Sequence, residues 1–378
     1  MPDFGYPTQG FNEKEKLVIK KAKNRYSLKA SICSKKIGIK YITLFCRQFS
    51  TMLGAGLIII NSLDTLKRQT ENKKLKISIE DIIEDIQRGK PLSEAMRDTY
   101  SFPIMLISMV EVGEVSGQLD VILERLSNYY EKENKLLKKI HSSLMYPMFI
   151  AVISFISIAF LITKVLPVYK DMFSQFDAEL PWITVMLLSL SDGIKNNLLI
   201  IGGVILASIF ILKRLSKSAK FNFFIDNLKL NIIILGKVNK KVLAARFART
   251  LSIMLSSGIP LIKSMDIIEN TIKNTVALEA IREWKQRMKN GDSLNAAMSE
   301  SNIFPLMLIH MIGIGEETGN LDNMLIKASD YLDDEIDIEL STLVTLIEPI
   351  IIVILTVIVG IVVVSIILPM FSIYKYML

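Results

Sequence analysis

The chain has 378 residues, of which 51% are apolar and 22% are charged, and its net charge is +7. The mean hydropathy of +0.39 is high for a soluble protein, so the apolar residues must be concentrated in particular segments. This composition excludes a disordered chain and a collagen-like fibre. The only cysteines are Cys33 and Cys46, and there are two histidines. A disulfide scaffold is therefore excluded, and a histidine-based metal site or catalytic triad has little support.

Three segments carry no charge over lengths that approach the thickness of a membrane, at about 144–163, 198–212 and 349–368. A helix of about 20 apolar residues crosses roughly 30 Å of hydrocarbon at 1.5 Å per residue. The sequence therefore predicts transmembrane helices at residues 144–166, 196–212 and 346–368. The second is the shortest and needs its flanking residues to reach spanning length. The alternative for each segment is a buried core helix.

Lysine and arginine predict how these helices are oriented. Residues 1–143 and the stretch after residue 212 are rich in both, whereas the connection at 167–195 holds only two lysines against four acidic residues. No apolar signal segment is recognisable near the N-terminus. We therefore expect the N-terminus in the cytoplasm, and the loop at 167–195 and the tail at 369–378 outside.

An internal repeat relates the two halves of the chain by a shift of 202 residues without a gap. FCRQFSTMLGAGLIIINSLD at 45–64 matches FARTLSIMLSSGIPLIKSMD at 247–266. FPIMLISMVEVGEVSGQLD at 102–120 matches FPLMLIHMIGIGEETGNLD at 304–322. Because one register holds over so long a stretch, it predicts two copies of one domain.

The repeat also divides the chain into domains. We expect a basic N-terminal segment at 1–39, a first cytoplasmic bundle at 40–143 and a second at 213–345, beside the membrane helices, loop and tail given above. Each bundle precedes a span that runs outward, and the second span returns the chain to the cytoplasm.

Within each copy the apolar spacing is helical, and glycine and proline separate five or six helices with no strand-like alternation. The expected fold class is an all-α integral membrane protein with two repeated cytoplasmic helical bundles and three transmembrane helices. The positions of glycine and proline predict helix ends at Gly56, Gly89, Gly258 and Gly291, and near Gly113 and Gly315. They also predict helix starts at Pro103 and Pro305, and Ser116 and Thr318 are the expected caps of the last helix in each copy.

Four ionisable residues recur in both copies and are candidates for partner contact or for a structural role. Arg47 and Arg249 lie at equivalent positions on the first helix of each bundle, while Glu114 and Glu316 lie in the repeated glycine-containing turn motif. The glutamates could cap or pair locally, or face a partner, and both alternatives remain open. For the arginines we expect an ion pair, with candidate partners Asp64, Asp266, Glu114 and Glu316.

Glu348 is a fifth candidate, because it precedes Pro349 at the mouth of the third span, where a carboxylate is costly unless paired or hydrated. Snorkelling to the interface is the alternative. The acidic run at 330–337 could bind a divalent cation. A solvated helix face is preferred for it, and lysines at equivalent positions of the first copy suggest pairing between bundles.

The sequence gives no catalytic, cofactor-binding or metal residues. We find no repeated nucleophile–base pair and no nucleotide-binding loop. The basic first domain is better explained by a membrane surface than by nucleic acid, so no direct nucleic-acid partner is expected.

As a set, RQFSTMLGAG, GKPLSEAM, VGEVSGQLD, the MYP at the first span and the IEP at the third resemble the type II secretion F / type IV pilus assembly PilC family. So does LPVYKDMFSQFDAELPWIT after the first span. The resemblance covers about residues 35–378. It implies a non-enzymatic platform in the bacterial inner membrane, without cofactors.

The partners that this resemblance implies are a hexameric assembly ATPase, pilin or pseudopilin subunits, other inner-membrane assembly proteins and further copies of the chain. A small-solute transporter or channel is the alternative function. A membrane-bound enzyme or signalling protein is a third hypothesis.

Overall fold

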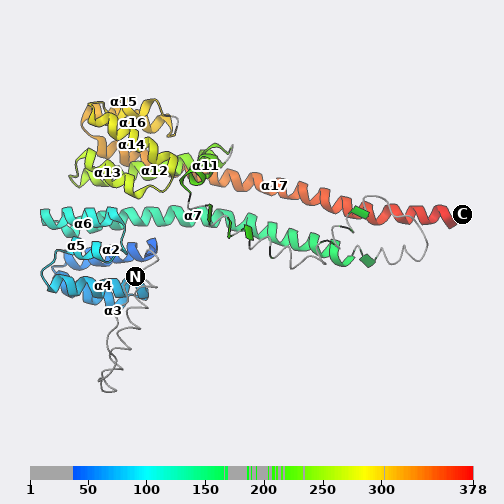
Figure 1. Cartoon of the computed structure of the whole chain (residues 1–378), viewed down its shortest axis with the longest axis horizontal. Helices are drawn as coiled ribbons and strands as arrows, with labels where there is room; N and C mark the ends of the chain where they lie inside the picture. The colour runs from blue at the N-terminus through cyan, green and yellow to red at the C-terminus, as the bar shows by residue number, and fades with distance from the viewer. Residues whose placement is uncertain are drawn as a thin grey trace, which may run out of the picture.

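The computed structural model describes residues 37–165, 218–232, 235–301 and 303–377, with scattered residues between 166 and 217 (Figure 1). These ranges contain helices and no strand, which confirms the all-helical expectation. The first copy consists of α2 (Ile39–Gly54), α3 (Ile59–Gln69), α4 (Lys73–Gln87), α5 (Leu92–Asp98), α6 (Ile104–Ser116) and α7 (Leu119–Phe160), which ends in a π-helical turn η1 (Leu161–Val165).

The second copy repeats this order of helices. It consists of α12 (Leu235–Ser256), α13 (Leu261–Thr271), α14 (Thr275–Lys289), α15 (Leu294–Ser299), α16 (Leu306–Thr318) and α17 (Leu321–Met377), preceded by α11 (Ala219–Asn231). The repeat in the sequence is therefore a repeat of the fold.

Aromatic side chains at equivalent positions form the centre of each bundle. Phe45 and Phe102 lie with ring centroids 5.5 Å apart in the first bundle, and Phe247 and Phe304 lie 5.2 Å apart in the second. All four are almost fully buried. Burying such rings supplies much of the apolar free energy that holds a small helical bundle together.

The turn after α6 differs from the expected one. Gly117 and Gly319 have the left-handed backbone that ends α6 and α16, with φ of 70° and 67°. Gly113 and Gly315, expected near the helix ends, lie within these helices. A Cβ on Gly113 would lie 3.1 Å from the Cα of Leu119, and one on Gly315 only 2.8 Å from the equivalent atom of α17. Glycine is needed here because the next helix packs closely.

The expected caps on the last helix of each copy are wrong. Ser116 and Thr318 are the final residues of α6 and α16, and Gln118 is the N-cap of α7. The Thr318 hydroxyl donates to the backbone oxygen of Ile314 at 2.7 Å. It therefore bonds back into its own helix instead of starting the next one.

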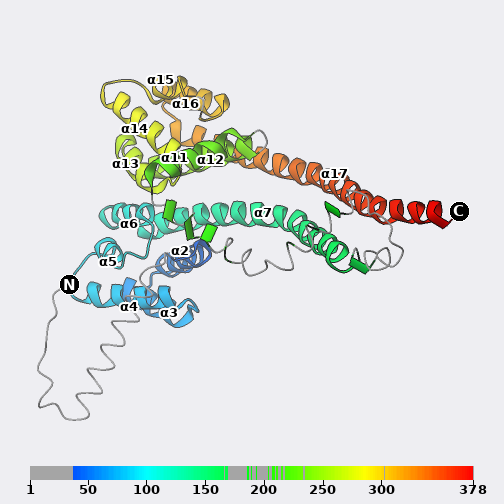
Figure 2. The same ribbon diagram turned by 45° about the vertical axis from the view of Figure 1, so that its right-hand side comes forward.

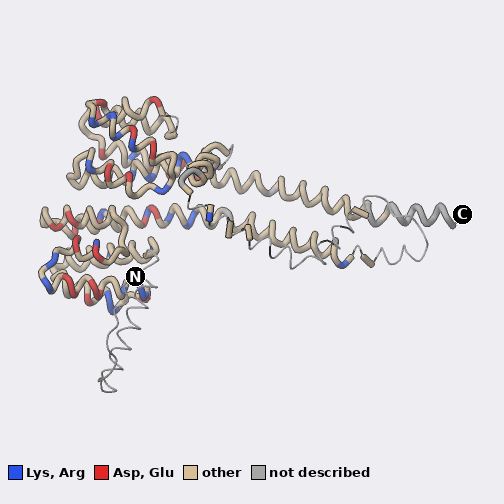
Figure 3. Tube along the Cα trace, viewed as in Figure 1, with Lys and Arg blue, Asp and Glu red and all other residues tan. Residues whose placement is uncertain are grey.

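The helices α7 and α17 run from the bundles into long apolar stretches without a break (Figures 1 and 3). Both are long and apolar enough to cross a membrane, and almost none of the side chains in their apolar windows is buried inside the chain. A core helix of a soluble domain would be buried. Apart from scattered residues, the expected segments at 167–195 and 196–212 lie outside the described residues. The helix α17 continues through the expected tail to Met377.

The two bundles lie on opposite sides of α7, and both long helices leave them in the same direction (Figures 1 and 2). On one side α7 packs against α2. On the other it packs against α12 and the bundle end of α17. The junction between the bundles is therefore built largely on α7.

Candidate functional site

The two glutamates of the repeated motif occupy the same place in the two bundles. Glu114 accepts hydrogen bonds from the backbone N–H groups of Leu92 and Ser93, at 2.5 and 2.9 Å. Glu316 accepts the equivalent pair from the first residues of α15, at 2.7 and 2.9 Å. Each carboxylate thus covers otherwise unpaired donors at the start of a short helix, where negative charge is favoured.

The arginine partners expected from the sequence are wrong. Arg47 pairs with Glu131, and Arg249 pairs with Asp333, at the same separation of 84 residues. Each pair joins the first helix of a bundle to its last helix. The expected acids pair elsewhere, since Asp64 bonds to Lys67 and Arg68 on its own helix, and Asp266 bonds to Lys285.

A buried charged cluster lies where the bundles meet. The Glu133 carboxylate of α7 forms ion pairs with two arginines of α12. Its oxygens lie 2.6 Å from a guanidinium nitrogen of Arg246 and 3.5 Å from one of Arg249. Asp333 of α17 completes the cluster through Arg249. Burial raises the pKa of Asp333 above its ordinary value, and the Arg249 charge opposes that shift. Two cations and two carboxylates therefore balance within the junction.

Further polar contacts line the same junction. The hydroxyls of Tyr129 and Thr250 are 3.0 Å apart. Arg125 donates to the backbone oxygen of Ser256 and, at 3.1 Å, to the hydroxyl of Ser257. These contacts place α7 against α12 in a single register.

Side chains of the acidic run at 330–337 also form ion pairs across this junction. Lys132 bonds to Asp330 at 2.5 Å, and Lys139 bonds to Asp337. Within the second bundle, Lys241 pairs with Glu335 at 2.5 Å. Lysines of the first copy thus meet acids of the second, as the charge pattern suggested.

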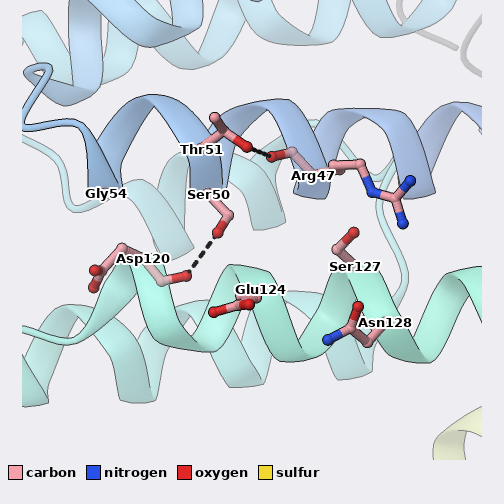
Figure 4. A pocket seen from close by; sticks show the side chains of 8 residues that line it. All are labelled: Arg47, Ser50, Thr51, Gly54, Asp120, Glu124, Ser127 and Asn128. Atoms are coloured by element: carbon pink, nitrogen blue, oxygen red, sulfur yellow. Dashed lines mark hydrogen bonds between the residues drawn. The ribbon is translucent and has the colours of Figure 1, made fainter.

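A polar depression of about 350 Å³ opens between α2 and the start of α7. Arg47 and Ser127 line one end, and Gly54, Asp120 and Glu124 line the rest (Figure 4). The Ser127 hydroxyl is buried without a hydrogen-bond partner. The depression is small and carries no cluster of acids, cysteines and histidines suited to a metal ion among the described residues.

The sequence did not single out Glu133 or Arg246. Comparison of the copies contained a signal, because Arg246 stands where the first copy has Leu44. An arginine that replaces an apolar residue on an equivalent helix indicates a different environment. Glu348 lies in α17, but its side chain is outside the described residues.

The fold and its junction define a duplicated all-helical protein whose two bundles each continue into a membrane-length apolar helix. The family model for type II secretion system protein F matches residues 45–167 and again residues 247–369. The two matches are offset by the same 202 residues as the repeat. The chain therefore belongs to this family, whose members are platform proteins of pilus and secretion machinery.

Relatives cover most of the chain. It is 36% identical to the type IV pilus assembly protein PilC of Thermus thermophilus over 337 residues, which is 89% of this chain and 83% of the relative. It is 35% identical to PilC of Pseudomonas aeruginosa over 90% of this chain and 91% of the relative. It is 30% identical to the type II secretion system protein F of Aeromonas hydrophila over 88% and 86%.

Proposed function

We propose that the chain is a three-span platform in the bacterial cytoplasmic membrane, in a type IV pilus, type II secretion or DNA-uptake machine. Its bundles receive motion from a hexameric assembly ATPase, and its spans pass that motion to pilin or pseudopilin subunits. The names of its relatives support the pilus or secretion role. The proposal includes homo-oligomerisation and contact with other assembly proteins of the membrane. A solute transporter is not favoured by these relatives.

The observation that carries this proposal is the continuity of α7 and α17. Each helix begins inside a bundle and continues into its apolar segment without a loop. A continuous helix couples the movement of its two ends, whereas a flexible linker would absorb it. The arrangement therefore suits a protein that relays movement from the cytoplasm to the membrane.

The path of the chain supports a third span. Both α7 and α17 leave the bundles in the same direction, while α11 starts again beside the bundles (Figure 1). If both long helices cross one membrane, the residues between 165 and 219 must cross it once more in reverse. The apolar segment at 196–212 has the composition for that return.

Reporter fusions test the topology. We expect a reporter active only in the cytoplasm to work after Leu215 and to fail after Phe176. The reason is the asymmetry of lysine and arginine around the spans. The reverse pattern would contradict the orientation, and activity at both sites would contradict the return span.

Insertions in α7 test the relay. Seven alanines placed after Ser142 extend the helix by about two turns and keep its phase, whereas seven glycines at the same place interrupt it. We expect the alanine variant to retain pilus or secretion output and the glycine variant to lose it, at equal abundance in the membrane. Equal output from both variants would show that helix continuity is not used.

Binding of the ATPase is tested separately by co-purification from membranes. We expect the cognate assembly ATPase to co-purify with both insertion variants, because the bundles are unchanged. Failure of the wild-type chain to retain it would contradict the proposed partner.

A further inference from the structure

The two bundles do not face each other symmetrically. In the first bundle α6 and α7 supply the junction, where α6 packs against α13 and α7 packs against α12 and α17. The contact of α7 with α17 joins equivalent helices, whereas those of α6 with α13 and of α7 with α12 join helices that are not equivalent. The repeat-equivalent pairs, α16 with α3 and α17 with α2, show no comparable packing in the described parts of the chain. The bundles are thus joined head to tail, and each contributes a different face.

A head-to-tail junction leaves one unused copy of each face. On α7, Tyr129 and Leu136 are buried, with 9% and 6% exposed. Their counterparts on α17 are Tyr331 and Ile338, which are 49% and 65% exposed. The side of α17 that carries Asp330 and Asp337 already packs against α7. We call α16 together with the side of α17 that carries Tyr331 and Ile338 the free α17 face.

The other unused face lies on the first bundle. Thr250 and Ile259 are buried in the second bundle, at 4% and 3% exposed. Their counterparts are Gln48, which is exposed, and Leu57, which is 42% exposed. We call the outer side of α2 and the start of α3 the free α2 face.

The two free faces reproduce one of the two ion pairs that Glu133 makes in the existing junction, since Arg246 has Leu44 as its counterpart. Glu133 receives Arg249 within the chain, and the repeat counterparts of these residues are Glu335 and Arg47. The Arg47 side chain is 52% exposed and available from outside. A copy docked in the same way would therefore place a carboxylate against an arginine again.

The depression beside Arg47 fits the same geometry. Arg125 reaches the end of α12 at Ser256, and the counterparts of these residues are Lys327 and Gly54. Gly54 lines the depression together with Asp120 and Glu124 (Figure 4). A lysine from a second copy would thus enter a site that carries two carboxylates.

We propose that the free α17 face of one copy docks on the free α2 face of a second copy and repeats between chains the junction within the chain. The occupant is this same protein, because the template for the contact is its own bundle pair. Since α7 and α17 run in the same direction, the docked copy keeps its spans parallel to those of the first. The contact is heterologous, so it can continue to a third copy or close into a ring.

Crosslinking of the full-length protein in membranes tests this surface. Cys33 is replaced by serine, and Cys46 is kept because it is buried and burial raises the pKa of its thiol well above the ordinary value. Gln48→Cys and Tyr331→Cys are then introduced, at the counterparts of the contacting pair Thr250 and Tyr129. With a short bismaleimide we expect dimers and larger species.

Single variants distinguish this contact from a symmetric one. Gln48→Cys alone and Tyr331→Cys alone should give no crosslink, whereas a mixture of the two chains should give only heterodimers. Gln48→Cys with Glu283→Cys, on the exposed side of α14, is the matched negative control. Tyr129→Cys with Thr250→Cys should crosslink within one chain. Crosslinking of Gln48→Cys alone, or none in the double variant, would overturn the proposal.

A charge swap gives a second measurement. Arg47→Glu should lower the crosslinked fraction several-fold, and adding Glu335→Arg should restore it. Failure of the swap to restore crosslinking at normal melting temperature would also contradict the proposed contact. The inference rests on the homo-oligomer within the proposed function. Because it is measured without pilus or secretion output, its failure leaves the platform role to be judged by the insertion and co-purification experiments.

Discussion

The first and second bundles share their helices, turns and capping glutamates, yet they differ in what surrounds equivalent positions. Arg47 is half exposed and makes one ion pair, whereas Arg249 is buried and bridges two carboxylates from different bundles. The helices, turns and capping glutamates that the bundles share are therefore those that the fold of each bundle requires. The positions whose surroundings differ are those at which one bundle contacts the other.

The largest difference is expected from truncating the two arginines. Arg249→Ala removes the cation that pairs with Asp333 and one of the two that pair with Glu133. We expect a loss of about 3 kcal/mol of unfolding free energy, because an uncompensated buried charge is costly. Arg47→Ala should cost less than about 1 kcal/mol, as is typical of exposed pairs. Thermal melting of both variants in detergent measures this, and equal losses would contradict the buried cluster.

Replacing the glycine at which the next helix packs closely should also affect the stability of the two bundles to different extents. Gly315→Ala brings a Cβ within 2.8 Å of backbone, and Gly113→Ala within 3.1 Å. We expect both to destabilise by about 1–3 kcal/mol, with the larger loss in the second bundle. Gly54→Ala is the control, since nothing lies within 4 Å of its added Cβ. A larger loss for Gly113→Ala would show that the second bundle adjusts more easily.

The capping glutamates should behave alike in both bundles. Glu114→Ala and Glu316→Ala each remove two hydrogen bonds to a helix start, so we expect each to cost about 1 kcal/mol. Glu317→Ala, at an exposed neighbouring position, is the control. Pilus or secretion output should follow protein abundance. Loss of output at normal melting temperature would instead indicate that a partner binds these carboxylates.

The smallest expected difference between the bundles is in how their stability responds to acidic pH. Hydrogen bonds from Lys285 and then Arg282 lower the pKa of Glu269 below its ordinary value of 4.5. The carboxylate therefore adds stability above that pH and loses its contribution as the pH falls through its folded pKa. The first bundle has Lys67 at the equivalent position.

Melting temperature measured between neutral pH and about pH 3.5 tests this prediction. Glu269→Gln should reduce the acid sensitivity by less than about 1 kcal/mol, because the ion pair is only partly shielded from water. An unchanged pH profile would show that the ion pair contributes nothing measurable.

The sequence was sufficient for the parts of the fold that depend on local pattern. The 202-residue register, the helical spacing and left-handed turns such as Gly56 all follow from residue type and order, and the structure has them. Local capping by Glu114 was among the alternatives, but its target, the start of α5 at 22 residues' distance, was not predicted. Local rules failed at Gly113, where the reason for glycine is contact with the next helix.

The ion pairs could not be predicted because they join helices far apart in the chain. Arg47 reaches Glu131 only once α2 lies along α7, and no nearby spacing indicates that packing. Glu133 resembles any other acid among lysines until α12 covers it. The register between bundles is a property of the junction and is absent from either copy read alone.

The unbroken course of α17 has a mechanical consequence. A helix of 57 residues is about 86 Å long, at 1.5 Å per residue. If it stays straight, a tilt of about 10° at the bundle displaces its far end sideways by about 15 Å, which exceeds the diameter of a helix. A modest rocking of the bundles would thus be amplified into a larger displacement at the far end of the helix. Pro349 and Pro369 each remove a backbone hydrogen bond within this helix, and they mark the points where it bends most easily.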